Sequence, residues 1–344
     1  MRVDLFDFHL PEDRIASYPA EPRDASKLLC VGKACFYDRQ VRDLPTLLSP
    51  GDLLIFNQSK VIPARLYGKR GEAKIEILLH KNKDGGIWET FARPAKKLKP
   101  GDKITFAANF SAIVKEKTKQ GLVQIAFEQK NILPLLDKYG QMPLPPYIPR
   151  HDTPDESDKT RYQTVYAKTE GSVAAPTAGL HFTKTLLEDL TAHGINTAFV
   201  TLHVGGGTFL PVKTEDTADH VMHSEWGEVS SETADLINHT RKAGGKIVAV
   251  GTTSLRLLES AANDTRQVQP FSGETAIFIT PGYRFKVVDR LLTNFHLPKS
   301  TLFMLVAAFA GLERMKDAYA HAIEHDYRFY SYGDACLLEP QAET

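Results

Sequence analysis

The sequence lacks the features that mark several common protein classes. Three cysteines in 344 residues, a small and odd number, argue against a disulfide framework. The longest apolar run, Leu302 to Leu312, is far too short to span a bilayer. The first residues carry acids where a signal peptide has its apolar core. We therefore expect a cytoplasmic protein that makes no membrane contact.

Familiar catalytic and metal-binding motifs are also missing. The chain has no GxxxxGK phosphate loop, no GxGxxG fingerprint and no GxSxG elbow, which disfavours P-loop enzymes, dinucleotide-binding enzymes and serine hydrolases. The order of His220, His223 and Glu225 matches no zinc motif. Cys30 and Cys35 flank an expected hairpin turn, so we expect them to face each other as paired strand residues. No metal is expected.

Net charge is zero, but the charge is segregated along the chain. Residues 60–119 hold 15 Lys/Arg against 6 Asp/Glu, or +9, and the remainder holds 27 against 36, or −9. Such segregation is typical of a module that faces a polyanion. Lysine-rich strands that protect their own edges would give the same pattern. The charge pattern alone does not separate these two interpretations.

The periodicity of the same region predicts a separate β module. Between Ala64 and Phe127, short apolar runs recur about every 8–12 residues with glycine turns between them. This is typical of a small antiparallel β-barrel of about six strands. We expect it to be inserted into an α/β main domain, with residues 61–149 as the barrel and residues 1–60 and 150–344 as the catalytic domain.

Strands and helices alternate after the expected barrel. Thr183 and Ser230 (or Ser231) are expected N-caps of two helices, and an apolar helix begins near Ser300. Strands are expected at 195–204, 246–250, 275–279 and 287–292. This order predicts a mostly buried sheet covered by helices.

Two glycine loops stand out at the centre of this domain. Gly171 to Gly179 places Thr177 beside a proline, and Gly205 to Gly207 is a run of three glycines after an apolar strand. A backbone without side chains can approach a ligand closely. We therefore expect both loops at a substrate site, and the candidate binding residues are Thr177, Gly179, Gly205, Gly206 and Gly207.

A third candidate loop, Gly251 to Ser254, turns from a strand into a helix expected at 255–262. Free N–H groups there, with the hydroxyls of Thr252 and Thr253, can bind an anion, and Arg256 can pair with a carboxylate. The alternative is that Ser254 simply caps the helix, and spacing alone favours that interpretation.

Three histidines lie at the ends of expected elements. These are His181, His203 and His296, each beside glycine, threonine or asparagine, with Asn294 next to the last. A single histidine in such a place is usually a hydrogen-bonded structural residue. Three of them favour a shared cleft, because loops on a rigid scaffold often carry function.

Seven stretches together resemble one family. They are 57–66 (NQSKVIPARL), 162–167 (YQTVYA), 175–183 (APTAGLHFT), 202–212 (LHVGGGTFLPV), 251–259 (GTTSLRLLE), 293–302 (TNFHLPKSTL) and 327–335 (YRFYSYGDA). Their order and coverage resemble the S-adenosylmethionine:tRNA ribosyltransferase-isomerases of the queuosine pathway. One local departure is Gln58, where the family pattern leads us to expect an acidic residue.

The resemblance implies a specific transferase reaction. The ribosyl part of S-adenosylmethionine, a cosubstrate, is transferred to 7-aminomethyl-7-deazaguanine at the tRNA wobble position and rearranges to give epoxyqueuosine. Adenine and methionine are released. Two other classes are a methyltransferase using the same cosubstrate, which would release S-adenosylhomocysteine, and a non-catalytic RNA-binding module, which would show no turnover. The motifs disfavour both.

Roles for single residues follow as hypotheses. A base must remove a proton beside the sulfonium, and histidine suits this near neutral pH, with His203 as first candidate and His181 as second. Asp334 can accept from the guanine-like edge of the base. Lys96, Lys97 and Lys99, beside a turn of the barrel, are expected to contact tRNA phosphates. We expect a monomer.

Overall fold

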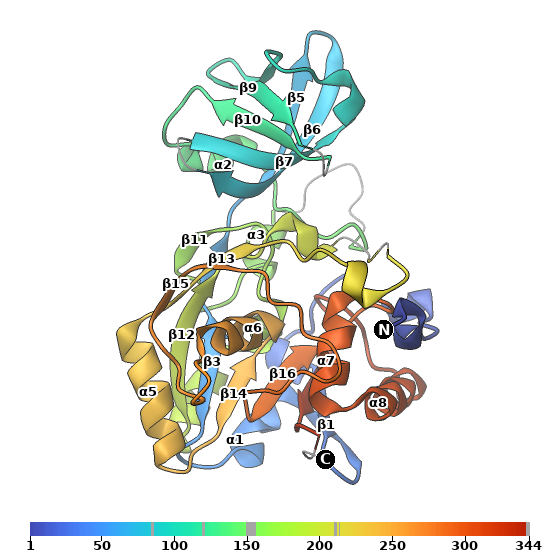
Figure 1. Ribbon diagram of the computed structural model, residues 1–344, viewed down its shortest axis with the longest axis vertical. Coiled ribbons are helices and arrows are strands. Elements are labelled where there is room, and N and C mark those ends of the chain that lie inside the picture. Colours follow the sequence, from blue (N-terminus) through green and yellow to red (C-terminus); the bar gives the residue numbers. More distant parts are fainter. Residues whose placement is uncertain (84–85, 119–120, 149–155, 210–211, 213, 342–344) are drawn as a thin grey trace.

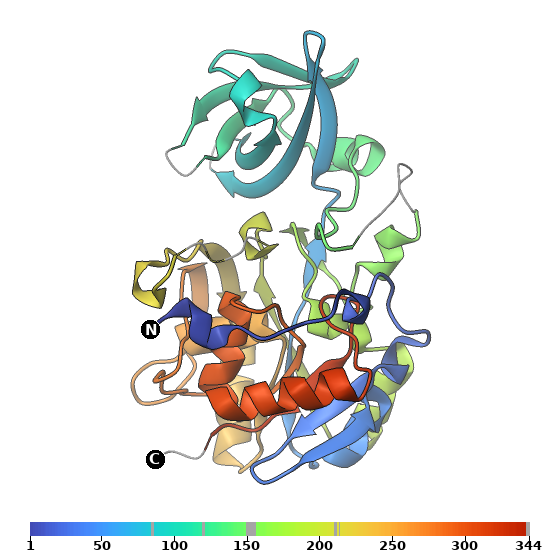
Figure 2. The same ribbon diagram turned by 90° about the vertical axis from the view of Figure 1, so that its right-hand side faces the viewer.

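The structure, a computed structural model, describes residues 1–341 except 84–85, 119–120, 149–155, 210–211 and 213. It has two parts, a β-barrel and a larger α/β part, which lie one above the other along the longest axis of the molecule (Figure 1, Figure 2). None of the helices in these described ranges combines the length and apolarity that a membrane span needs.

The smaller part is a closed barrel with the strand order β10-β7-β6-β5-β8-β9. Its antiparallel strands are β5 (Arg65–Arg70), β6 (Ala73–Lys83), β7 (Ile87–Arg93), β8 (Lys103–Ala107), β9 (Phe110–Lys117) and β10 (Val123–Phe127). Along β6, Ile75, Ile77 and Leu79 point into the barrel core, as the strand period of two requires. Helix α2 (Leu133–Tyr139) adds Leu136 to that core. The expected barrel of about six strands is confirmed.

The larger part is built on a nine-stranded sheet with the order β15-β13-β12-β3-β14-β16-β17-β1-β2. Its strands are β1 (Lys27–Val31), β2 (Phe36–Gln40), β3 (Leu53–Asn57), β12 (Asn196–Leu202), β13 (Glu225–Val229), β14 (Ile247–Val250), β15 (Phe271–Thr275), β16 (Arg290–Asn294) and β17 (Ala335–Leu338). The four central strands, β12, β3, β14 and β16, run parallel. A separate small parallel sheet pairs β4 (Ser59–Val61) with β11 (Thr169–Ser172).

Helices cover both faces of the large sheet. They are α1 (Leu44–Leu47), α4 (Lys184–Ala192), α5 (Ser231–Lys242), α6 (Thr252–Ala261), α7 (Thr301–Ala310) and α8 (Leu312–Glu324), with the short α3 (Asp158–Arg161) near the barrel (Figure 1). On β3, Leu53 and Ile55 belong to one core and Leu54 and Phe56 to the other. Two buried faces explain why this strand is apolar at successive positions.

Side-chain caps begin three of the helices. The hydroxyls of Thr183, Ser230 and Ser300 accept from the backbone N–H three residues onward, at 3.1 to 3.2 Å. The expected caps at Thr183 and Ser230 are therefore confirmed.

Two local predictions are wrong. Cys30 pairs with Tyr37 across β1 and β2, so Cys35 lies in the turn and the two thiols do not face each other as a strand pair. The strand expected at 275–279 is β15, which ends at Thr275. The Thr275 hydroxyl accepts from the N–H of Ile277, and this local bond turns the chain out of the sheet.

Polar contacts join the barrel to the α/β part. Lys81 on β6 donates to Ser224 at 2.9 Å and forms an ion pair with Glu274 at 2.5 Å. The ring centroids of His80 and His223 lie 5.6 Å apart across the same junction. The expected division into residues 61–149 and the flanking ranges stays a prediction, and its second boundary falls among residues 149–155, outside the described residues.

Candidate functional site

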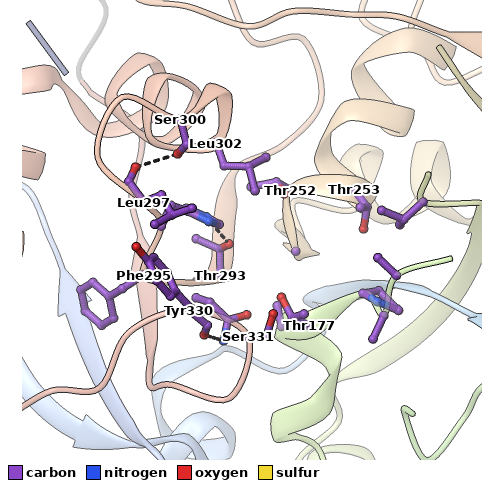
Figure 3. Close-up of a pocket in the computed structure, with 18 of the residues that line it drawn as sticks. Thr177, Thr252, Thr253, Thr293, Phe295, Leu297, Ser300, Leu302, Tyr330 and Ser331 are labelled. Atoms are coloured by element: carbon purple, nitrogen blue, oxygen red, sulfur yellow. Dashed lines mark hydrogen bonds between the residues drawn. The ribbon is translucent and has the colours of Figure 1, made fainter. Parts of the chain in front are cut away.

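A cavity opens just beyond the carboxyl ends of the parallel strands β12, β14 and β16. It holds about 740 Å³ of space free of atoms, its open mouth included. Open α/β sheets usually bind ligands at this edge. Figure 3 shows Thr252 and Thr253 at the start of one helix, Thr177 on a neighbouring segment, and Thr293 to Ser300 on the opposite side.

The cavity wall is mostly apolar and carries uncharged polar groups. Its described lining residues are Tyr147, 174–178, Val204, 251–253, 293–297, Ser300, Leu302, Tyr330 and Ser331. These include no Asp, Glu, Lys or Arg. Hydroxyl, amide, imidazole and backbone groups therefore provide the polar contacts of this wall.

The cavity brings together five of the residues expected at the site from sequence. They are Thr177, Thr252, Thr253, Asn294 and His296. The described lining does not include Gly179, Ser254, Arg256 or the glycines 205–207. Sequence order alone does not show which ends of a buried sheet share one opening.

The start of α6 forms one side of the cavity. The helix begins at Thr252, and its N-cap, Gly251, has φ +88° and no side chain to cap the first turn. Ser254 is not the cap that spacing favoured, because its hydroxyl lies inside the helix and donates to the Val250 carbonyl at 2.9 Å. The first-turn N–H groups have no acceptor among the described residues.

The opposite side holds a hydrogen-bonded pair, Asn294 and His181. Asn294 Nδ2 lies 3.1 Å from His181 Nε2 and 3.2 Å from the carbonyl of Tyr330. An amide NH₂ only donates, so His181 Nε2 accepts and this histidine is neutral. Burial, with the nearby charges of Arg328 and Arg23, lowers the pKa of His181 to about 3. His181 closes the 3₁₀ turn η7 (Thr177–His181), which begins at the cavity.

His296 lines the cavity directly. Its Nε2 lies 3.0 Å from the Thr293 hydroxyl, and burial lowers its pKa to about 3. It is therefore a neutral polar group at physiological pH, able to exchange hydrogen bonds with a bound molecule through Thr293 or its own ring.

His203 lies next to the cavity wall rather than in it. Its neighbour Val204 lines the cavity, its ring stacks on Trp226 with centroids 5.4 Å apart, and Gly171 leaves room for it. Burial lowers its pKa, and its Nδ1 has no partner among the described residues. A neutral imidazole with a ring nitrogen that makes no hydrogen bond can accept a proton.

Gly205 and Gly206 pack against the barrel, and Gly207 packs against His223 of the α/β part. A Cβ at Gly205 would meet the His80 ring at 2.7 Å, one at Gly206 would meet Phe91 at 3.3 Å, and one at Gly207 would meet His223 at 2.9 Å. The absence of side chains thus allows this loop to fit closely under β6 and β7. Leu210 and Pro211 of the same motif lie outside the described residues.

Arg256 and Asp334 are both engaged within the protein. Arg256 is 4% exposed and forms an ion pair with Glu225, and its Nε donates to the Ile277 carbonyl. Asp334 accepts from the backbone N–H groups of Lys27 and Arg328 at 3.0 and 2.7 Å. Their expected contacts with substrate stay predictions.

Gly179 and the three lysines lie away from the described cavity wall. A Cβ at Gly179 would lie 1.9 Å from the Tyr166 hydroxyl, so glycine is required for close packing there. Lys96 and Lys97 on η6 (Ala95–Lys97) and Lys99 after it are all exposed on the barrel. In the described ranges no group of His, Cys, Asp and Glu is arranged to hold a metal ion.

Sequence reasoning missed two aromatic residues of the cavity. The rings of Tyr147 and Tyr330 lie 4.5 Å apart, and the Tyr147 hydroxyl is 2.7 Å from that of Ser331. Tyr330 has φ +71°, an unusual value for a residue with a side chain and one that clusters at functional sites. The YRFYSYGDA motif contained Tyr330, but Tyr147 sits in a proline-rich stretch that carried no recognisable signal.

Comparison with known proteins covers nearly the whole chain. The family model described as queuosine biosynthesis protein matches residues 3–338. A protein of Rhodospirillum rubrum is 58% identical over 340 residues, 98% of each chain. A protein of Sphingopyxis alaskensis is 56% identical over 342 residues, 99% of this chain and 97% of its own. Both are named S-adenosylmethionine:tRNA ribosyltransferase-isomerase.

A solved structure is also similar. The crystal structure of S-adenosylmethionine tRNA ribosyltransferase from Thermotoga maritima is 38% identical, with a TM-score of 0.56. The match covers 97% of this chain and 99% of that one.

Proposed function

Because this chain belongs to the queuosine biosynthesis protein family, we propose that it transfers and isomerises the ribosyl moiety of S-adenosylmethionine onto 7-aminomethyl-7-deazaguanine at the tRNA wobble position. The products are epoxyqueuosine-tRNA, adenine and methionine. The observation that carries this proposal is the full-length match to relatives named for the same two substrates, at 56–58% identity.

The cavity supports the proposal as the cosubstrate site. Its position beyond β12, β14 and β16 and its mostly apolar wall suit S-adenosylmethionine, a nucleoside joined through a sulfonium to an amino-acid side chain. Thr177, Thr252, Thr253, Asn294 and His296 are the described candidate residues that contact the cosubstrate here. The transferase needs no metal in this scheme.

His203 is the proposed proton acceptor. The reaction requires loss of a proton from the carbon beside the sulfonium, and a neutral imidazole can take it. His203 precedes the cavity-lining Val204, and its Nδ1 has no partner among the described residues, whereas Nε2 of the second candidate, His181, already accepts from Asn294. The departing adenine must gain a proton as its bond to the ribose breaks, and methionine leaves when the carbon–sulfur bond breaks.

The other proposed residues act around this centre. The glycine loop, Gly205 to Gly207, directly follows the cavity-lining Val204. Arg256 holds this loop in place indirectly, because its partner Glu225 accepts from the N–H of Gly205. Gly179 and Ser254 support the same wall by close packing and by the bond inside α6. Asp334 is proposed to face the guanine-like edge of the base, and the barrel lysines the tRNA backbone.

One incubation separates this function from its competitors. The chain is mixed with S-adenosylmethionine and tRNA that carries the aminomethyl base, and both the released small molecules and the tRNA mass are measured. Free adenine and methionine with a matching mass gain on the tRNA support the proposal. S-adenosylhomocysteine would indicate a methyltransferase instead, and tRNA binding without turnover would indicate an RNA-binding module. A cytoplasmic location and a monomeric state belong to the same proposal.

A further inference from the structure

We propose that the cavity recognises the amino-acid end of S-adenosylmethionine as a zwitterion. The first-turn N–H groups of α6 bind the α-carboxylate, and Asn294 Oδ1 accepts from the α-ammonium group. His181 is a positioning residue that fixes the orientation of the Asn294 amide. This inference rests on the function proposed above and assigns one end of the cosubstrate to named atoms.

The first observation is the open N-terminus of α6, a helix of 10 residues. Its N-cap is a glycine at φ +88°, so no side chain covers the first turn. The N–H groups of Thr252, Thr253 and Ser254 have no acceptor among the described residues, and Thr253 Oγ1 is buried without a partner. Such an end carries partial positive charge and attracts an anion.

The second observation is a buried acceptor on the facing strand. Asn294 is 2% exposed and lines the cavity, and its Oδ1 has no partner among the described residues. A buried acceptor left without a donor destabilises the fold. An ammonium group is a donor that removes this cost, whereas a carboxylate at the same place would be repelled.

His181 determines which way the amide faces. Both protons of Asn294 Nδ2 are used, one by His181 Nε2 and one by the carbonyl of Tyr330. A flipped amide would place Oδ1 against these two acceptors, which is repulsive. Because the His181 ring stays neutral, this orientation holds throughout the physiological pH range. Oδ1 is therefore the part of the amide that remains for a ligand.

Strand register places the two sites side by side. β14 and β16 are parallel neighbours in which Val250 pairs with Leu292. The N–H of Gly251 donates to the Leu292 carbonyl at 2.7 Å, so the start of α6 lies beside the end of β16. Neighbouring strands lie roughly 4.8 Å apart. Both segments line the cavity, so one ligand can contact the start of α6 and Asn294 at the same time.

The charge of the wall agrees with this assignment. The described lining residues carry no formal charge, so an amino-acid end with no net charge fits better than an isolated carboxylate. Arg256, the cation expected from sequence to meet the carboxylate, is committed to Glu225 instead. The helix end supplies the positive potential in its place.

The experiment compares three ligands on the full-length wild-type protein by calorimetry. They are S-adenosylmethionine, its analogue without the α-amino group, and its decarboxylated analogue. We expect each analogue to bind about 10- to 100-fold more weakly, since each leaves one buried partner unpaired. Asn294→Leu should weaken S-adenosylmethionine binding by a similar factor and bind the deaminated analogue no worse than wild type does.

His181 has its own pair of variants. His181→Phe keeps a ring of similar size but cannot accept from Asn294, so it should lose most of the discrimination against the deaminated analogue. His181→Gln offers a side-chain oxygen as acceptor and should restore it. A purely structural role would alter melting temperature alike for all ligands and would leave the ratio of the two affinities unchanged.

The outcomes are distinct from those of the proposed function. Wild-type protein that binds S-adenosylmethionine and its deaminated analogue equally overturns the zwitterion assignment, whether or not any variant folds. Equal discrimination by wild type and Asn294→Leu overturns the role of Asn294. If wild-type protein consumes S-adenosylmethionine but binds it no more tightly than the deaminated and decarboxylated analogues, only this inference fails. If it neither binds nor consumes S-adenosylmethionine, the proposed function fails as well.

Discussion

The guanidinium of Arg256 is held by the carboxylate of Glu225 in the interior of the α/β part. Nη1 and Oε2 lie 2.5 Å apart, and the two side chains are 4% and 5% exposed. The other carboxylate oxygen accepts from the N–H of Gly205 at 3.0 Å. One acid therefore ties α6, which begins at the cavity, to the glycine loop that packs beneath the barrel.

Breaking this pair should destabilise the protein strongly. Glu225→Gln keeps the shape of the side chain but leaves the Arg256 charge buried without its counterion, which typically costs about 3–5 kcal/mol. The double variant Arg256→Met with Glu225→Gln removes both charges and should recover much of that stability. Urea unfolding of the four proteins in a double-mutant cycle measures the coupling. A Glu225→Gln stability equal to wild type would contradict a buried pair in solution.

Side chains added to the glycine loop should destabilise the protein more where the barrel lies closer. Gly205→Ala places a Cβ 2.7 Å from the His80 ring and should destabilise the protein by about 1–3 kcal/mol through overpacking. Gly206→Ala, whose Cβ would lie 3.3 Å from Phe91, is the matched control and should cost less. Adding His80→Ala should rescue Gly205→Ala, because it removes the obstructing ring. Thermal unfolding measures these three variants and His80→Ala alone, and an absence of rescue would place the strain elsewhere.

Local signals in the sequence were enough for much of the fold. The spaced apolar runs between Ala64 and Phe127 predicted the barrel, because a closed antiparallel barrel has short strands with one inner face. Thr183 and Ser230 predicted helix starts, since capping depends on residues only three positions apart. Interactions between residues that are near one another in the sequence determine both features.

Long-range pairing explains what the sequence left open. From the sequence, Arg256 was expected to bind a substrate carboxylate. Its partner Glu225 lies 31 residues earlier, on β13, and the two meet because α6 packs against that strand. Ser254 had the spacing of a cap, yet the helix begins two residues sooner, at Thr252, where Gly251 permits a positive φ. Nothing in the proline-rich stretch around Tyr147 indicated that its ring would meet Tyr330 at the cavity.

Buried neutral histidines should make the fold sensitive to acid. Burial lowers the pKa of His181 and His296 to about 3 and, with His223 nearby, that of His80 to about 4. The unfolded chain has histidine pKa values of about 6.5, so it binds more protons than the folded chain below that pH. The stabilising contribution is therefore complete above about pH 6.5 and is lost as pH falls toward 4.

The slope of stability against pH measures this effect. Each such histidine lowers the stability by up to about 1.4 kcal/mol per pH unit in that window. His80→Phe, which cannot be protonated, should give a shallower fall between pH 6.5 and 4.5 than wild type. His239→Phe, at an exposed position on α5, is the control and should keep the wild-type slope. Identical slopes for all three proteins would mean that His80 titrates normally in the fold.

Protonation of His203 should cause the fall in turnover at low pH. His203→Gln should lower turnover about 10²-fold or more, because an amide cannot accept the proton. Since burial lowers the pKa of His203, wild-type turnover should persist below pH 6.5 and fall only as pH drops through that lowered pKa. The variant's residual turnover should lack this fall. Near-normal turnover with an unchanged pH profile would remove His203 from proton transfer, and His239→Gln serves as the exposed control.

Three lysines of the barrel are exposed around one turn. Lys96, Lys97 and Lys99 lie together beside the turn at Pro100 and Gly101 and are exposed, so they can approach phosphates with little loss of hydration. If they bind the tRNA backbone, replacing all three with alanine should raise the KM for tRNA and leave the affinity for S-adenosylmethionine unchanged. The slope of log affinity against log salt should become shallower by about one unit for each phosphate that the variant no longer neutralises.

A control of equal charge separates direct phosphate binding from general electrostatics. Lys33, Lys184 and Lys242 are exposed lysines on the α/β part, and their triple replacement removes the same net charge. The net charge of the protein changes equally in both triple variants, but only the barrel variant should release fewer counterions on binding, because only its lysines neutralise phosphates. If the two variants show the same salt slope, or if the barrel variant keeps the wild-type slope and tRNA affinity, the lysines serve only to keep strand edges soluble. A shallower slope in the barrel variant alone places this face of the barrel against the tRNA.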